Sequence, residues 1–201
     1  MTLFDQLKTM QLKQLQHDEK YHKEIWLLDV QRRATHMVLH FAKYSSKINT
    51  AIYLKDNSCL TRQLIDMAII AISTANIFNV SLYTFALTER ERSCSNITEL
   101  AEELFASLDI KGTNPEYEIS IKINNSIAGM CKAAEALDHL EDFPFKTSII
   151  NGTAELFRYS LALLHTIEAR DIPSIIGDRL VMIEKKNFFF EETGNYITGY
   201  K

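Results

Sequence analysis

Apolar residues recur every three to four positions along most of this chain. This spacing is present in residues 3–15 and again in residues 25–48, and it matches one face of an α-helix. Residues 64–82 carry apolar side chains nearly all round the helix, at least in the middle of the segment. That distribution is typical of a helix at the centre of a bundle. The pattern therefore predicts an all-α protein with residues 64–82 at its core.

Polar and turn-forming residues divide the periodic segments. Residues 49–58 are predicted to be a connection, with Ser58 or Thr61 as the N-cap of the central helix. Asn96 followed by Glu99 resembles a capping box, and residues 111–115 form a strong turn signal. Further helices are predicted over 117–141, 148–169 and 174–186, with Pro173 as the break before the last.

Two of the predicted segments match at a fixed offset of 92 residues. Ala42 corresponds to Ala134 and Leu64 to Leu156, and several other paired positions are both apolar. We interpret this as two tandem helical hairpins, at about residues 25–86 and 117–178, within a single all-α domain of residues 1–201. Two unrelated amphipathic hairpins of similar length would also produce matches of this kind, so the alternative stays open.

Composition narrows the classes of function. Hydrophobic residues make up 46% of the 201, Gly and Pro are few, and the formal charge is −4. Scarce Gly and Pro favour helices, and a negative charge gives no general attraction to nucleic acid. Three scattered cysteines indicate reduced thiols. The longest apolar run, residues 67–72, is too short to span a bilayer. We therefore expect a cytoplasmic protein without a nucleic-acid or membrane partner.

Three acidic residues in the second half are candidate metal ligands. Glu135 and Asp138 lie one turn apart on a shared helix face, and Glu155 on the next helix could meet them across an antiparallel hairpin. Magnesium prefers oxygen ligands and accepts a few carboxylates when a phosphate completes its shell. The three acids therefore predict an Mg²⁺ site, although a solvated helix face would show the same spacing.

The sequence pattern around these acids resembles a known family. Glu135-x-x-Asp138 followed by Glu155-x-x-Arg158 resembles the paired motifs of the MazG-type all-α nucleoside triphosphate pyrophosphohydrolases. The segment 184–187 is similar to the basic stretch after the last helix in that family. The resemblance implies a bundle of MazG-like hairpins in which Glu135, Asp138 and Glu155 hold Mg²⁺ for catalysis. It also implies cleavage of an NTP or dNTP to a nucleoside monophosphate and pyrophosphate.

The basic residues of this pattern are the predicted contacts to the substrate. Lys185 and Lys186 would lie near the phosphates of the nucleotide. Arg158 stands where the family places a metal-binding aspartate, so it would either hold a phosphate or neutralise Glu155. In the first half, Asp66 remains while the other three acidic positions are Lys43, Ser46 and Gln63.

Two hypotheses follow from these departures. The first is an Mg²⁺-dependent nucleotide pyrophosphohydrolase, or a diverged relative that still binds a nucleotide. The second is a non-enzymatic helical interaction protein that keeps the scaffold without a working metal site. A homodimer is compatible with both.

One pair of histidines offers a different metal chemistry, and a second pair lies in a charged run. His36 and His40 have the i, i+4 spacing of some zinc sites. Because neither an H-E-x-x-H motif nor a cysteine pair accompanies them, we interpret them as packing or polar-face residues. His17 and His22 lie in a charged run beside Asp18, which we interpret as a solvated helix face.

Overall fold

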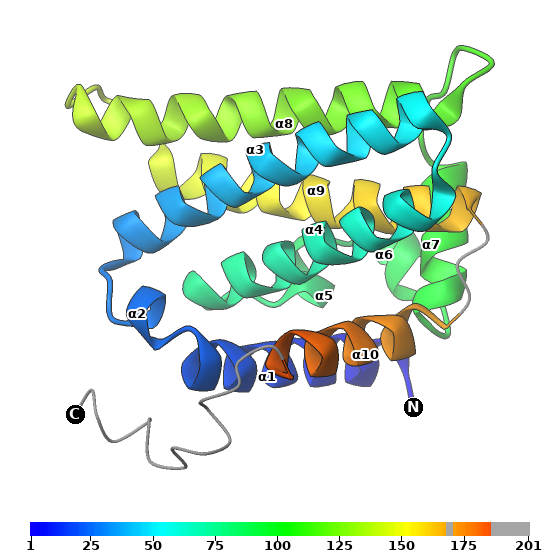
Figure 1. Cartoon of the computed structure of the whole chain (residues 1–201), viewed down its shortest axis with the longest axis horizontal. Helices are drawn as coiled ribbons and strands as arrows, with labels where there is room; N and C mark the ends of the chain where they lie inside the picture. Colours follow the sequence, from blue (N-terminus) through cyan, green and yellow to red (C-terminus); the bar gives the residue numbers. More distant parts are fainter. Residues whose placement is uncertain (168–170, 186–201) are drawn as a thin grey trace.

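The computed structural model describes residues 1–167 and 171–185, and this part of the chain contains ten helices and no strand (Figure 1). The all-α prediction is confirmed. The helices are α1 (Leu3–Tyr21), α2 (Lys23–Trp26), α3 (Val30–Leu54), α4 (Asn57–Ile77), α5 (Leu82–Phe85), α6 (Glu89–Arg92), α7 (Ile97–Ala106), α8 (Pro115–Asp138), α9 (Phe145–Thr166) and α10 (Ile172–Glu184).

Four long helices form the centre of the bundle. Helix α3 packs against α4 and α8 against α9, while α4 also contacts α9 and α3 contacts α8. Helix α1 covers α4, α7 covers α9, and α10 lies against α1 (Figure 1). Each predicted hairpin thus contains two consecutive helices that pack together, although a common origin of the two stays a prediction.

Helix α4 is the most buried element of the described chain. Every residue from 63 to 75 is buried, including the polar side chains of Gln63, Asp66 and Ser73. This confirms the prediction of a central helix. The apolar side chains of α4 belong to one core cluster that extends over the whole bundle. None of the described helices is both long and apolar enough to cross a membrane.

The connection predicted at residues 49–58 is wrong, because α3 continues to Leu54. The helix ends where Lys55 adopts a left-handed conformation with φ of 55°. Asp56, rather than Ser58 or Thr61, then caps α4 by accepting a hydrogen bond from the Cys59 amide. The loop between α3 and α4 is therefore only two residues long, which favours their antiparallel packing.

A second difference concerns the start of α3. The helix predicted from Ile25 is interrupted after Trp26, and Asp29 caps a new helix by accepting from the Arg32 amide. Pro173 lies in the first turn of α10, where a proline N–H is not needed. The interruption between α1 and α3 has the larger effect on the fold, because residues 22–29 then turn across one end of the bundle.

Candidate functional site

The predicted magnesium ligands lie at two separate places on the hairpin of α8 and α9. Glu135 and Asp138 are exposed at the end of α8, and Glu135 Oε2 is 3.2 Å from Lys132 Nζ. Glu155 on α9 instead accepts a hydrogen bond from Ser126 Oγ at 2.6 Å. Ser126 precedes Glu135 by about 13 Å along the axis of α8. The structure thus brings Glu155 to Ser126, and the Mg²⁺ site of these acids stays a prediction.

Arg158 forms a buried ion pair. Its Nη1 and Nη2 donate to Glu91 Oε2 and Oε1 at 2.5 and 2.7 Å, and Nη1 also donates to the Ala86 carbonyl at 2.9 Å. The carboxylate partner is Glu91 of α6, not Glu155. Burial acts to raise the pKa of Glu91, but hydrogen bonds from Arg158 and Thr88 outweigh it and hold that pKa below its ordinary value. A phosphate contact by Arg158 stays a prediction.

The remaining basic candidates lie at the end of α10. Lys185 is exposed at the C-cap of that helix, and Lys186 lies outside the described residues. One turn and a half earlier, Arg179 binds buried Asp66 of α4 through Nε–Oδ1 and Nη2–Oδ2 hydrogen bonds of 2.6 and 2.8 Å. This ion pair fixes α10 on α4 and forms one wall of a pocket.

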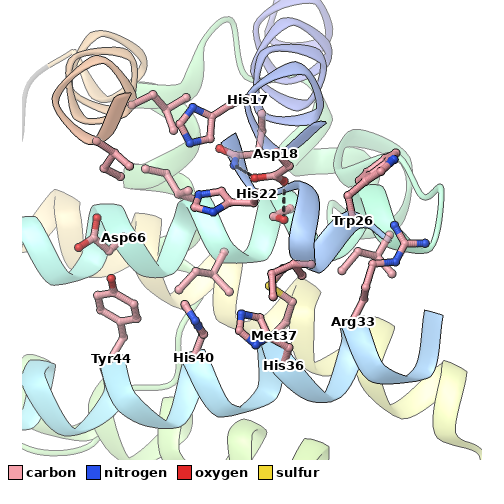
Figure 2. A pocket seen from close by; sticks show the side chains of 18 of the residues that line it. His17, Asp18, His22, Trp26, Arg33, His36, Met37, His40, Tyr44 and Asp66 are labelled. Atoms are coloured by element: carbon pink, nitrogen blue, oxygen red, sulfur yellow. Dashed lines mark hydrogen bonds between the residues drawn. The ribbon is translucent and has the colours of Figure 1, made fainter. Parts of the chain in front are cut away.

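The pocket has a volume of about 320 Å³ and lies between α1, α2, α3, α4 and α10 (Figure 2). Figure 2 shows Asp66 and Tyr44 at one end, Trp26 and Arg33 at the other, and histidines between them. Most of its lining is apolar, with Met37, Ile69 and Ile70 among the residues that contribute. An apolar cavity with a few convergent polar groups is the usual form of a small-molecule site.

One wall of this pocket consists of His17, Asp18 and His22. His17 is only 5% exposed, and its Nδ1 donates to Glu184 Oε1 at 3.0 Å. The interpretation of this run as a solvated helix face is therefore wrong for His17. Asp18 is held beside it through an accepted hydrogen bond of 2.6 Å from Ser73 Oγ. Burial raises the pKa of Asp18, against hydrogen bonds that lower it.

The opposite wall carries His36 and His40 on α3. Their ring centroids are 4.5 Å apart, and both rings line the pocket (Figure 2). Burial lowers the pKa of both imidazoles, that of His40 to about 4, with Lys43 acting in the same direction. Burial therefore favours the neutral form of both rings.

Two polar atoms in the pocket lining have no hydrogen-bond partner among the described residues. They are the Nε of Arg33 and the Oε1 of Gln14. The Arg33 guanidinium lies 5.1 Å from the centre of the Trp26 ring, which it faces as a cation–π contact. Buried polar groups are almost always paired in folded proteins, so these two atoms indicate where a ligand would bind.

Gln14, Trp26 and Arg33 were not among the residues that the sequence suggested. The available signal was the i, i+4 spacing of His36 and His40. That spacing predicts a shared face for His36 and His40, whereas bringing them close to His17 and His22 depends on the turn at residues 22–29.

Comparison with protein-family models, with curated proteins and with solved structures finds no match.

Proposed function

We propose that this chain binds a small molecule that joins an aromatic ring to an anionic group, with a nucleotide as the expected ligand. The observation that carries the proposal is the buried Nε of Arg33, which has no acceptor among the described residues. A guanidinium binds phosphate oxygens through short, charge-assisted hydrogen bonds. A phosphate at this end of the pocket would therefore provide the missing acceptor.

The rest of the lining suits an aromatic ring. Met37, Ile69 and Ile70 give the pocket an apolar floor, and Trp26 contributes an indole at the end where Arg33 lies. Its volume of about 320 Å³ is near the lower limit of small-molecule sites, which is about 300 Å³. A mononucleotide fits this size class better than a dinucleotide does.

The proposal favours nucleotide binding over pyrophosphate release. Hydrolysis between the α and β phosphates would require the Mg²⁺ site predicted at Glu135, Asp138 and Glu155, and Glu155 hydrogen-bonds Ser126 instead of meeting the other two. The binding pocket lies on different helices from these acids. We therefore propose the diverged form of the sequence hypothesis, in which a nucleotide is bound without being cleaved there.

Arg33 and its neighbour Arg32 form a matched pair for the test. Arg33→Gln removes the guanidinium from the pocket, whereas Arg32 has a side chain that is 76% exposed and lies beside Asp29 on the surface. Calorimetric titration with a panel of nucleoside mono- and triphosphates is expected to show binding to the native chain and to Arg32→Gln. Arg33→Gln should bind at least about 10-fold more weakly, which is the loss of one charge-assisted hydrogen bond.

The unphosphorylated nucleosides serve as the ligand control and should bind more weakly than their phosphates. Absence of binding across the panel, or equal affinity of Arg33→Gln and Arg32→Gln, would contradict the proposal. In the first case the helical interaction protein becomes the better hypothesis.

A further inference from the structure

We propose that His17, Asp18 and His22 bind a divalent transition-metal ion of the zinc type at the edge of the pocket. Each residue offers one ligand atom, and these atoms all lie within 4.8 Å of one another. They are the one group of three or more such residues found in the described part of the chain. The inference concerns the pocket proposed above, but it is tested with the metal alone.

The distances within the group suit a metal after a small adjustment. Zinc lies about 2.0–2.2 Å from imidazole nitrogen or carboxylate oxygen, so two ligand atoms of a tetrahedral site are about 3.3–3.6 Å apart. Atoms within 4.8 Å reach such positions through small side-chain rotations. His22 has the freedom to make them, since its side chain is 44% exposed.

The hydrogen bond of the His17 imidazole is of the kind that orients a metal ligand. Metal-binding histidines usually direct their second ring nitrogen at a carboxylate, which fixes the tautomer and leaves the other nitrogen for the metal. His17 Nδ1 is 3.0 Å from Glu184 Oε1, and His22 Nδ1 is 3.8 Å from Glu24 Oε1. The hydrogen bond leaves Nε2 of His17 for a metal, whereas the longer His22–Glu24 contact leaves both ring nitrogens of His22 available.

The carboxylate of the group is held in a similar way. Asp18 Oδ1 accepts from Gln14 Nε2 at 2.7 Å, and Oδ2 accepts from Ser73 Oγ at 2.6 Å. Each oxygen keeps a further lone pair for an ion. Gln14 is only 3% exposed, and its Oε1 has no partner among the described residues.

That unpartnered oxygen is an independent sign of a ligand. Gln14 donates through Nε2 to Asp18 Oδ1, so its amide lies beside the carboxylate of the group, and its Oε1 requires a hydrogen-bond donor. A water molecule bound to the metal would donate to it. Three protein ligands with an open position for water is the usual form of a catalytic or ligand-binding zinc site.

The ligand types select the class of metal. Two imidazoles and one carboxylate suit zinc, iron or nickel, whereas magnesium prefers a shell of oxygen atoms. His36 and His40 face the group from the other side of the pocket (Figure 2). Burial lowers the pKa of both imidazoles, which favours their neutral form beside a cation. This metal differs in kind and place from the Mg²⁺ expected at Glu135, Asp138 and Glu155.

The test uses the full-length protein stripped with a chelator and titrated with Zn²⁺ by calorimetry, without any nucleotide. Saturable binding of one ion per chain is expected, together with a raised Tm, because an ion that binds the native state stabilises it. Co²⁺ should give the visible absorption of a low-symmetry nitrogen and oxygen site. Mg²⁺ should produce neither effect.

His22→Ala should weaken Zn²⁺ binding by 100-fold or more, while His139→Ala serves as the matched control. His139 is an exposed histidine after α8, outside the group. Glu184→Gln should weaken binding about 10- to 100-fold through the orientation of His17. Far-ultraviolet circular dichroism of the metal-free variants verifies that each is folded.

Lack of 1:1 binding, or equal affinity of His22→Ala and His139→Ala, would overturn the proposal. The group would then be a buried carboxylate with two imidazoles and no ion. Because this titration contains no nucleotide and the Arg33 titration contains no added transition metal, either proposal can fail without the other.

Discussion

Arg158 and Glu91 illustrate how one charged residue can hold distant parts of this bundle together. The Glu91 side chain is 3% exposed, and both of its oxygens bind the Arg158 guanidinium. Glu91 Oε2 also accepts from the Thr88 amide at 2.8 Å, which completes a capping box on α6. The pair thereby joins the segment before α7 to the middle of α9.

Removing the Arg158 side chain should therefore lower the free energy of unfolding, which removal of an ordinary surface charge would hardly change. Arg158→Met is expected to lower the free energy of unfolding by about 3 kcal/mol, because it leaves the Glu91 carboxylate buried without a partner. Arg90→Met should cost less than about 1 kcal/mol, since Arg90 pairs with Glu103 while its own side chain is 79% exposed. Urea unfolding measures both, and equal losses would contradict a structural role for Arg158.

At the scale of the elements, a glycine lies at a tightly packed contact between α8 and α9. A Cβ placed on Gly152 of α9 would lie 2.5 Å from Cγ and 2.7 Å from Sδ of Met130, a fully buried residue of α8. The same construction at Gly129 of α8 meets nothing within 4 Å. The two glycines therefore have opposite roles in the same helical hairpin.

Because of this difference, replacing each glycine by alanine should change the free energy of unfolding in opposite directions. Gly152→Ala is expected to destabilise the protein by about 1–2 kcal/mol, because overpacking against Met130 outweighs the better helix propensity of alanine. Gly129→Ala should stabilise it by about 0.5–1 kcal/mol through propensity alone. Thermal and urea unfolding give both values, and a stabilising Gly152→Ala would show that the two helices can separate there.

The elements themselves were largely predictable, but their ends were not. Periodicity alone located α4 and its buried position, since residues 63–75 carry too few polar side chains to face water. The end of α3 was missed because the polar residues Asn49 and Thr50 remain helical, with Thr50 Oγ1 donating to the Ser46 carbonyl. The start of α3 at Asp29 was missed because Leu27 and Leu28 continue the apolar spacing.

At the scale of the whole molecule, the pocket was not predictable from local patterns. His17 and His22 follow one another on α1 and the turn after it, while His36 and His40 share a face of α3. Their convergence depends on packing between helices, which spacing within one helix does not encode. Among the acids chosen from sequence, Glu155 accepts a hydrogen bond from Ser126, nine residues before Glu135 on α8, and the Mg²⁺ site stays a prediction.

The histidines also make the stability of the metal-free bundle depend on pH. Burial lowers the pKa of His40 from 6.5 to about 4, and the charges of Lys43, His36 and His22 act in the same direction. Between these values the unfolded chain binds more protons than the folded one, so stability falls as pH decreases from about 6.5 to 4. The loss due to His40 is about 1–2 kcal/mol after allowance for solvent screening of a half-buried ring.

His40→Gln should therefore lose less stability than the native chain over this pH range. Urea unfolding at several pH values, in the presence of a chelator, measures the difference. His139→Gln is the control and should follow the native profile, because His139 is exposed. Parallel profiles for His40→Gln and the native chain would show that the folded protein protonates His40 without cost.

The place of Trp26 has a practical consequence. It is the one tryptophan among the 201 residues of the chain, and it lies in the wall of the pocket with the Arg33 guanidinium 5.1 Å from its ring centre. Its fluorescence therefore arises from the pocket, without background from indoles elsewhere. A phosphate that draws Arg33 from the ring will alter the emission intensity, and an ion such as Co²⁺ at His22 will quench it. The chain thus carries its own optical reporter of occupancy, and binding kinetics can be followed without a label.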